Sequence, residues 1–415
     1  MSTNAKGDQP MLAALVQAGD QQTEAEVIND FIFMAKDISN AYLVTCPDGD
    51  VLINAGFMNS APRNKAVFSA KRSGPLRAII LTQGHADHYG GVPELREADT
   101  KVIAEQRFTE TCNFFTELMP YLGRRSGKLW TGTIKREGIV VPTIIPDITS
   151  SGRQTMDIAG RQFELISTPG GEALDSLCVW LPNERVVFTG NLFGPVFMSM
   201  PNLCTLRGDK PRSAQRFLDS LNDIRQLNAE LLITGHGEPI RGAEKIRKDL
   251  DKLHAAVSYV KEATIAGMNA GKDVHSLMRE ITLPDELKIA EFHGKVSWAV
   301  RTIWEEHSGW FHHDSTTSMY GVPRSSIDGD LAQLAGGSNA LAHRAAQKVA
   351  ESKPLEAIHL LDIALGAEPS NSLALSTKKD ALSQLLSLSG GNNLSEVMWL
   401  KSEITAVETA LASAV

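Results

Sequence analysis

The stretch that decides the fold is Gln83-Gly84-His85-Ala86-Asp87-His88-Tyr89-Gly90-Gly91, which follows the nearly continuous apolar run Leu76–Thr82. That run predicts a buried strand. Two imidazoles and a carboxylate (His85, Asp87 and His88) lie within four residues at its end. Neutral imidazole and carboxylate ligands suit zinc, iron or manganese, so the loop predicts a metal site. The alternative is a solvated polar loop that happens to contain two histidines.

The same pattern recurs along the first half of the chain, where short apolar runs end in polar loops with glycine. One such loop ends in Pro169-Gly170-Gly171-Glu172, and another is Gly235-His236-Gly237. Loops of this kind commonly gather at one edge of a sheet and form a site. The other runs that predict strands are Phe31–Met34, Ala41–Thr45, Val51–Asn54, Phe163–Ser167, Leu177–Leu181, Val186–Thr189 and Leu231–Thr234. From about residue 240 the pattern becomes helical.

Composition excludes several classes of protein. The 415 residues are 42% hydrophobic and 22% charged, which is typical of a globular protein and argues against disorder or a coiled-coil rod. A formal charge of −8 gives no general basic field for nucleic acid or an anionic membrane. The four cysteines lie far apart in the sequence, which fits a reducing compartment. Since neither a signal peptide nor a long apolar run is evident, we expect a cytoplasmic protein without a membrane partner.

The loop at residues 83–91 resembles the metal-binding loop of the metallo-β-lactamase superfamily, T-H-x-H-x-D-H-x-G-G. The resemblance implies an α/β fold, an αββα sandwich with one or two metals at the edge of its sheets. It also implies that His85, Asp87 and His88 are metal ligands. Gln83 stands where the family has its first histidine, and an amide oxygen is a weaker ligand than an imidazole.

Further motifs are similar to those of one branch of this superfamily, the alkylsulfatases. Pro169-Gly170-Gly171-Glu172 fits the branch's P-G-x-E, which makes Glu172 a ligand candidate, and His236 matches its final ligand loop. Residues 202–208 resemble N-L-x-T-L-R-G, and Trp298–Phe311 resembles an aromatic and arginine-containing motif. The helical segment from residue 338 to 404 resembles the branch's dimerisation domain, which implies a homodimer. We expect an N-terminal extension (1–25), a catalytic domain (26–329, with a helical segment at 243–310) and a helical dimerisation domain (330–415).

Two departures from the branch affect the expected chemistry. Asn191 stands where the branch has an acidic bridging ligand, and the histidines usual just before N-L-x-T-L-R-G are absent. We therefore expect two unequal halves of the site. One half contains Asp87, His88 and His236, and the other contains Gln83, His85 and Glu172. Asn191 stands between them, at the shared position where the branch has its bridging ligand. The first half should bind one metal tightly, and a second metal should be weak or absent.

Zinc is the expected cofactor, with iron or manganese as possible replacements. Zinc lowers the pKa of a bound water from about 16 towards 7, which supplies a hydroxide nucleophile at neutral pH. Asp87 is a candidate ligand or base, and the spacing does not separate these roles. Arg207 and Arg212 are candidates for binding an anionic leaving group, because a guanidinium matches sulfate or carboxylate oxygens in pairs. The alternative for both is a surface arginine at a helix start.

Other residues leave alternatives open. Arg124-Arg125 is a further anion-binding candidate, and Asn113–Tyr121 with Trp130 could line a channel for an apolar tail or pack in the core. His312-His313-Asp314 also contains residue types that bind metals, so this stretch is a further candidate metal site.

The resemblance implies a metal-dependent hydrolase in which a metal-bound hydroxide attacks a sulfate or other ester of a small, partly apolar, anionic substrate. A lactone or carboxylic ester hydrolase is an alternative, and so is a mononuclear iron oxygenase, because two histidines and one carboxylate suit non-haem iron. A scaffold that has lost its metal is a third, non-enzymatic hypothesis.

Overall fold

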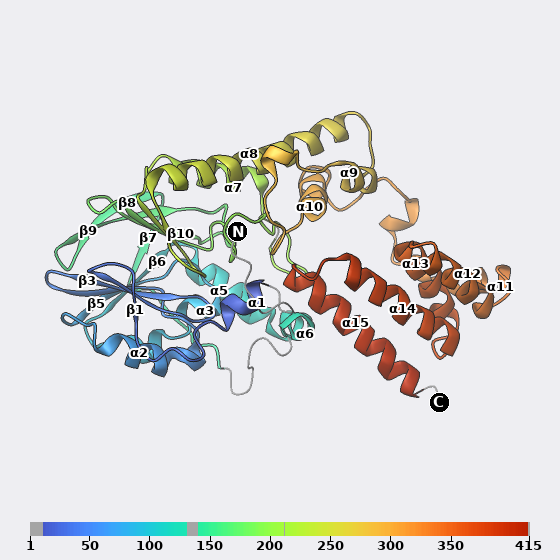
Figure 1. Ribbon diagram of the computed structural model, residues 1–415, viewed down its shortest axis with the longest axis horizontal. Coiled ribbons are helices and arrows are strands. Elements are labelled where there is room, and N and C mark those ends of the chain that lie inside the picture. The colour runs from blue at the N-terminus through green and yellow to red at the C-terminus, as the bar shows by residue number, and fades with distance from the viewer. Residues whose placement is uncertain (1–10, 131–139, 211, 414–415) are drawn as a thin grey trace. The chain divides into compact units, whose positions relative to one another are not determined.

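A first β-sheet is built from the N-terminal part of the chain (Figure 1). The computed structural model describes residues 11–130, 140–210 and 212–413, and within them this sheet has seven strands in the order β1-β2-β3-β4-β5-β6-β7. Strands β1 to β4 pair antiparallel, and β4 to β7 pair parallel. The strands are β1 (Glu26–Val27), β2 (Ile32–Ala35), β3 (Ala41–Cys46), β4 (Gly49–Ile53), β5 (Leu76–Ile80), β6 (Lys101–Glu105) and β7 (Ile148–Ser150).

A second sheet of six strands within the described residues faces the first, in the order β13-β12-β11-β10-β9-β8. Its pairs are antiparallel except for β11 with β12, which run parallel. The strands are β8 (Arg153–Ile158), β9 (Arg161–Ser167), β10 (Leu177–Leu181), β11 (Val186–Gly190), β12 (Leu231–Thr234) and β13 (Ile240–Arg241). All eight strands predicted from apolar runs are present, with ends that differ by at most two residues.

Helices cover the outer face of each sheet, while one apolar core lies between the sheets. In that core Tyr42 of β3 contacts Phe188 of β11, with ring centroids 5.5 Å apart. Alternating side chains of the first sheet pack on the other side against α2 and α5, and those of the second sheet pack against α7 and α8. This order of layers is the αββα sandwich expected from the sequence. The described helices up to residue 308 are α1 (Met11–Val16), η1 (Met58–Ser60), α2 (Ala61–Ser69), α3 (Ala86–Tyr89), α4 (Val92–Leu95), α5 (Phe108–Glu117), α6 (Met119–Trp130), α7 (Ala214–Arg225), α8 (Ala243–Asn269), α9 (Val274–Glu280), η2 (Asp285–Leu287) and α10 (Val296–Ser308).

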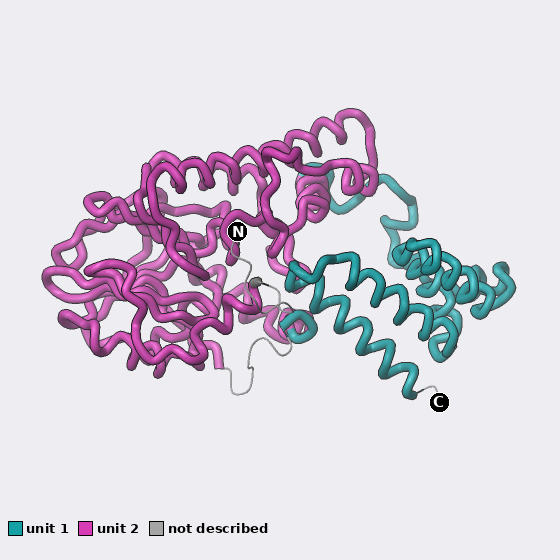
Figure 2. The backbone as a smooth tube through the Cα atoms, in the orientation of Figure 1, with its two compact units in different colours: residues 1–10, 127–131, 307–415 teal, residues 11–126, 132–306 magenta. Residues whose placement is uncertain are grey.

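The chain divides into two compact units, which Figure 2 colours separately. One contains the described residues from 11 to 126 and from 140 to 306, and the other contains residues 127–130 and 307–413. The second unit is helical, and the α12–α14 core is rich in alanine (Ala342, Ala345, Ala357), which lets the helices approach closely. Its helices are η3 (Thr316–Met319), η4 (Arg324–Ile327), α11 (Asp328–Leu334), α12 (Ser338–Ala350), α13 (Pro354–Ala367), α14 (Ser372–Leu388) and α15 (Leu394–Ser413). The expected bounds 26–329 and 330–415 stay a prediction.

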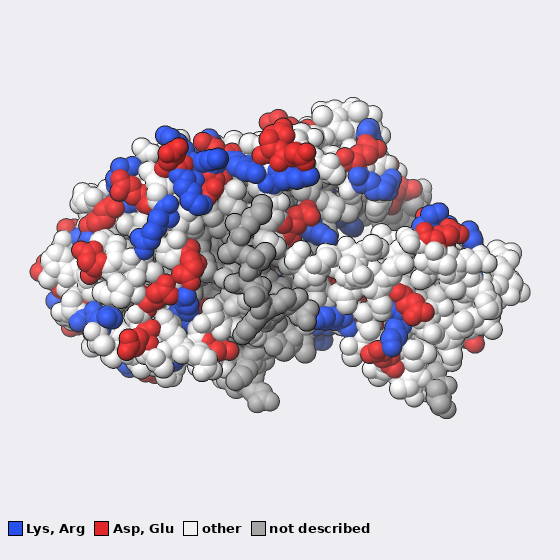
Figure 3. Space-filling model, in the orientation of Figure 1, with Lys and Arg blue, Asp and Glu red and all other residues white. Residues whose placement is uncertain are grey.

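The surface and the helices bear on the partners expected from the sequence. On the face drawn in Figure 3, basic and acidic side chains are interspersed over α7 and α8. Among the described residues, no helix is both long and apolar enough to cross a bilayer. The expected absence of a nucleic-acid partner stays a prediction.

Candidate metal centre

Three predicted ligands meet at one edge of the sandwich. The ligand atoms of Asp87, His88 and His236 all lie within 4.8 Å of one another, and among the described residues this is the one cluster of three or more histidine, cysteine or acidic side chains with such spacing. His88 and His236 are buried, and Asp87 is partly exposed. The rings of the two histidines are 6.2 Å apart and nearly perpendicular.

Strand ends bring these residues together. The loop after β5 leads into the short helix α3, which contains Asp87 and His88, while His236 follows β12. Tyr42 of β3 donates a hydrogen bond to the carbonyl of Thr234 (2.8 Å), which fixes the end of β12 against the first sheet. Gly235 allows a close approach there, because a Cβ at that position would lie 2.2 Å from Oδ1 of Asn191 and would force that side chain to move.

The surroundings of the two histidines fit a metal ligand role. Nδ1 of His88 lies 3.1 Å from Oγ1 of Thr82 and 3.2 Å from Oγ of Ser39, so two hydroxyls orient the ring. Nε2 of His88 and Nδ1 of His236 are buried and have no hydrogen-bond partner among the described residues. Burial, together with the positive charge of His85, lowers the pKa of His88 to about 3. Burial likewise lowers the pKa of His236 to about 4, so both imidazoles are neutral at pH 7.

The other predicted ligands form a second group that is already linked by hydrogen bonds. Nε2 of Gln83 lies 2.6 Å from Nδ1 of His85 and 3.4 Å from Oε2 of Glu172. Asn191 connects the two groups, because its Nδ2 lies 3.0 Å from Oε2 of Glu172 and 3.2 Å from Nε2 of His236. The amide oxygens of Gln83 and Asn191 are buried without a partner among the described residues. When Nδ1 of His85 carries a proton, the Gln83 amide presents its oxygen to that proton, because its NH₂ group cannot accept a hydrogen bond.

Two residues that the sequence did not single out complete this second group. His293 precedes α10, and its Nε2 lies 3.1 Å from Oε1 of Glu172. Asp209 is on the loop before α7, and its Oδ2 lies 3.7 Å from Nε2 of His85. Neither has a distinctive neighbourhood in sequence. Asp209 stands directly after the motif at 202–208, and this position was the one available signal.

The second group balances its charges without a metal. Burial opposes protonation of His85, but the nearby carboxylates of Asp209 (3.7 Å) and Glu172 (3.5 Å) raise the pKa of His85 to about 9. Burial would raise the pKa of Glu172, yet hydrogen bonds from His293 and His85 and the charge of Arg212 hold it well below its usual range. The same competition holds the pKa of Asp209 well below its usual range, through His85, Arg212 and Arg207. An imidazolium at His85 cannot ligate a metal until its proton leaves.

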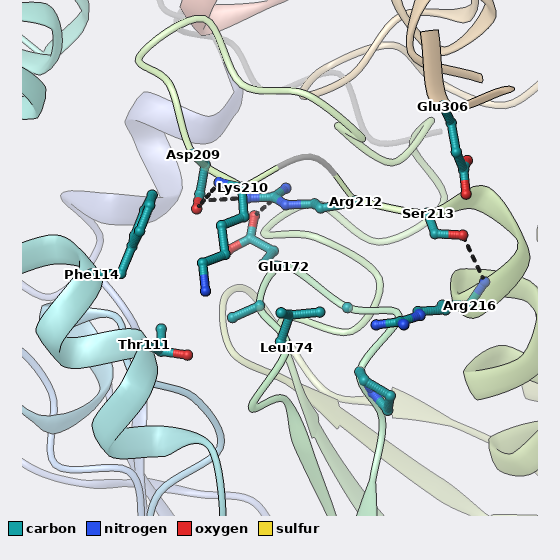
Figure 4. Close-up of a pocket in the computed structure, with 13 residues that line it drawn as sticks. Thr111, Phe114, Glu172, Leu174, Asp209, Lys210, Arg212, Ser213, Arg216 and Glu306 are labelled. Carbon is teal, nitrogen blue, oxygen red and sulfur yellow. Dashed lines mark hydrogen bonds and ion pairs between the residues drawn. The ribbon is translucent and has the colours of Figure 1, made fainter. Parts of the chain in front are cut away.

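A cavity of about 450 Å³ opens beside Glu172 (Figure 4). Phe114 lines it, and the ring of neighbouring Phe115 lies 5.1 Å from that of His85, so the aromatic stretch at 113–121 reaches the site. The positions of Phe114 and Phe115 therefore favour a role in lining a channel for an apolar tail over a role in core packing. The full lining is Thr111, Phe114, Pro169, Gly171, Glu172, Ala173, Leu174, Asp209, Lys210, Arg212, Ser213, Arg216 and Glu306.

The predicted arginines also lie here. Arg212 lines the cavity, its side chain is 8% exposed, and Nη1 lies 3.8 Å from Oε1 of Glu172, so the interpretation as a surface arginine is wrong for this residue. Arg207 is partly exposed and lies with its guanidinium 6.0 Å from the ring of Phe115. Arg125 donates hydrogen bonds to the carbonyls of Leu206 and Arg207, so it supports the loop. His312, His313 and Asp314 form no three-residue metal cluster among the described residues.

Comparison with known proteins agrees with this geometry. The profile of the metallo-β-lactamase superfamily matches residues 35–236, and that of the alkyl sulfatase dimerisation region matches residues 274–398. Residues 35–236 of the chain therefore form a metallo-β-lactamase domain, in agreement with the fold and with the clustered ligands. After this domain the chain carries an alkyl sulfatase dimerisation region, and its relatives include alkylsulfatases.

A linear primary-alkylsulfatase of Pseudomonas sp. is 27% identical over 303 residues, which cover 66% of this chain and 56% of that protein. The alkyl/aryl-sulfatase BDS1 of Saccharomyces cerevisiae is 24% identical over 394 residues, covering 86% of this chain and 60% of that protein. The chain thus spans little more than half the length of these relatives. The structure of the stereoselective inverting sec-alkylsulfatase Pisa1 from Pseudomonas sp. superposes with a TM-score of 0.84 at 19% identity, covering 98% of this chain and 72% of that one. At this level of identity the similarity supports the fold alone.

Proposed function

We propose that this chain is a metal-dependent hydrolase that cleaves a sulfate ester with an apolar part. The observation that carries the proposal is the convergence of Asp87, His88 and His236, which Asn191 connects to Glu172 in the lining of a cavity with cationic and aromatic walls. Two neutral imidazoles and one carboxylate leave coordination positions open for water and substrate. The alkylsulfatases among the relatives support sulfate as the group released.

The chain's own residues then bind and orient the substrate. A divalent cation at Asp87, His88 and His236 would supply a Lewis acid and an activated water. Arg207 and Arg212 bind the anionic head group through their guanidinium groups. Phe114 and Leu174 offer apolar surface in the cavity for the tail. Asp87 is then a ligand, which removes it as a free base.

The two groups should differ in metal affinity. His88 and His236 are neutral at pH 7, and their other contacts already orient them. In the second group a cation must displace a proton from His85 and compete with Arg212 and His293 for Glu172. We therefore propose one tightly bound zinc ion, with a second site that is weak or empty, where Gln83 and Asn191 could contribute amide oxygens.

Turnover tests the function. Zinc-loaded protein should hydrolyse a medium-chain alkyl sulfate, and His88→Ala and His236→Ala should each reduce kcat/KM at least 100-fold. His254→Ala is the matched control, because it removes a half-buried imidazole on α8. Zinc-loaded protein that cleaves a carboxylic ester or lactone of the same chain length but no alkyl sulfate would contradict sulfate as the substrate. A folded chain that binds no metal would support the scaffold hypothesis.

A mononuclear iron oxygenase is the second candidate, favoured by the same two-histidine, one-carboxylate cluster. Metal analysis of protein purified without air separates the two. Iron together with oxygen consumption would support the oxygenase, and zinc alone would exclude it. Manganese without oxygen consumption would leave the hydrolase in place with a different ion.

We also propose a cytoplasmic homodimer. The match to the dimerisation region at residues 274–398 supports the dimer. The free cysteines Cys46, Cys112, Cys178 and Cys204 fit a reducing compartment. Light scattering should give a mass of about twice 45.0 kDa. A mass that stays at one chain up to 100 µM would contradict the dimer.

A further inference from the structure

The two arginines proposed to bind the substrate's head group already contact an anion of the chain itself. Nη2 of Arg207 and Nη2 of Arg212 each lie 3.4 Å from Oδ2 of Asp209. Figure 4 shows Asp209 and Arg212 joined in this way at one wall of the cavity, next to Glu172. A carboxylate therefore occupies the space between the guanidinium groups where an incoming anion would bind.

The contacts between Asp209 and the arginines are weak ones. Charge-assisted hydrogen bonds of this type are usually about 2.7–2.9 Å long and often bidentate, whereas here one oxygen serves both arginines at 3.4 Å. The other oxygen, Oδ1, accepts a hydrogen bond from the backbone N–H of Lys210 at 2.7 Å. Asp209 is thus a poor match to the two forks. Its Oδ2 also lies 3.7 Å from Nε2 of His85, so an anion that displaces it from the arginines competes with that contact as well.

The arginines retain donors that Asp209 does not use. Nε of Arg207 and Nε of Arg212 are both buried without a hydrogen-bond partner among the described residues. The side chain of Arg212 is 8% exposed, and its one short bond goes from Nη1 to the carbonyl of Asn202 (2.6 Å). Buried donors without a partner cost free energy, and an anion with several oxygens would satisfy more of them than one carboxylate oxygen does.

We infer that Asp209 competes with the substrate's anionic head group for Arg207 and Arg212, and so weakens the binding of sulfate-type anions relative to uncharged esters. The inference rests on the proposed function for its link to catalysis. Asp209 is then a specificity-determining residue. An entering sulfate must displace this carboxylate and approach Glu172, whereas a carboxylic ester meets no such competition.

The test is Asp209→Asn, which keeps the shape of the side chain and removes its charge. The dissociation constant of inorganic sulfate, measured by calorimetry at low ionic strength, should fall at least tenfold. The KM for a medium-chain alkyl sulfate should fall by a similar factor, while the KM for a carboxylic ester of equal length should change less than threefold. Adding Arg212→Gln to Asp209→Asn should erase the gain in sulfate affinity.

Glu306→Gln is the matched control, because it removes one negative charge from the same cavity lining on the side away from Asp209 in Figure 4. It should change sulfate affinity less than threefold. If Asp209→Asn does not fold, Asp209→Ser removes the same charge and serves in its place. An unchanged sulfate dissociation constant in a folded neutral variant overturns the inference, whatever the turnover. Absence of turnover with every ester, alongside tighter sulfate binding, would instead overturn the proposed function alone.

Discussion

Nδ2 of Asn191 lies 3.2 Å from Nε2 of His236, so the residue at the shared position contacts the first group of ligands through its amide nitrogen. The same nitrogen donates to Glu172 of the second group. A carboxylate at this position would present two oxygens to the space between the groups. The amide therefore removes both a negative charge and a bridging ligand.

Restoring these lost ligands should create a second metal site. In the double variant Gln83→His/Asn191→Asp, an imidazole and a carboxylate replace two amides, which should raise bound zinc from one to two per chain. Mass spectrometry under native conditions and elemental analysis would count the ions. Asn222→Asp, at a half-buried position of α7 where Arg225 donates a hydrogen bond to it, is the control for an added acid and should leave the count at one. A count of two already in the unmodified chain would contradict the unequal halves.

Removing either buried imidazole should abolish tight metal binding. His88→Ala or His236→Ala leaves two of the three clustered ligands, and we expect the affinity for zinc to fall at least 100-fold. Competition against a chromophoric chelator measures this directly, independently of turnover. His254→Ala should bind zinc as the unmodified chain does. Equal affinity in all three variants would show that the metal binds elsewhere.

The sequence predicted the sandwich and much of the site because each candidate ligand follows a strand. His85, Asp87 and His88 follow β5, and His236 follows β12, so pairing of the strands brings their ends to one edge. His293 and Asp209 were missed because they lie on irregular loops. The loop of His293 is held by hydrogen bonds to residues 198–200, which are distant in sequence, rather than by a local pattern. The contact of Asp209 with Arg207 and Arg212 could not be predicted from the sequence either, because it depends on the exact positions of the three side chains.

The hydroxyl that orients His88 should matter for metal affinity. Oγ of Ser39 lies 3.2 Å from Nδ1 of His88 and donates to the carbonyl of Gly235 (3.1 Å), so it connects both histidine loops. Ser39→Ala should weaken zinc binding about 10-fold to 100-fold, the usual range for a residue that orients a ligand. Ser258→Ala removes a comparable serine contact to His254 (3.4 Å) and should have no such effect. An affinity within twofold of the unmodified chain would exclude this role for Ser39.

Metal affinity should depend little on pH between 7.5 and 5.5. The pKa values of His88 and His236, about 3 and about 4, lie below this window, so protons do not compete with the metal for either ring. Two imidazoles with an ordinary pKa near 6.5 would each lose about tenfold, or about 100-fold together, over the same range. We expect a change of less than threefold in the dissociation constant of zinc over this range, followed by a steep loss of affinity below about pH 4. A 100-fold loss of zinc affinity by pH 5.5 would show that the histidines titrate normally. The two imidazoles would then not be held neutral by their surroundings before the metal binds.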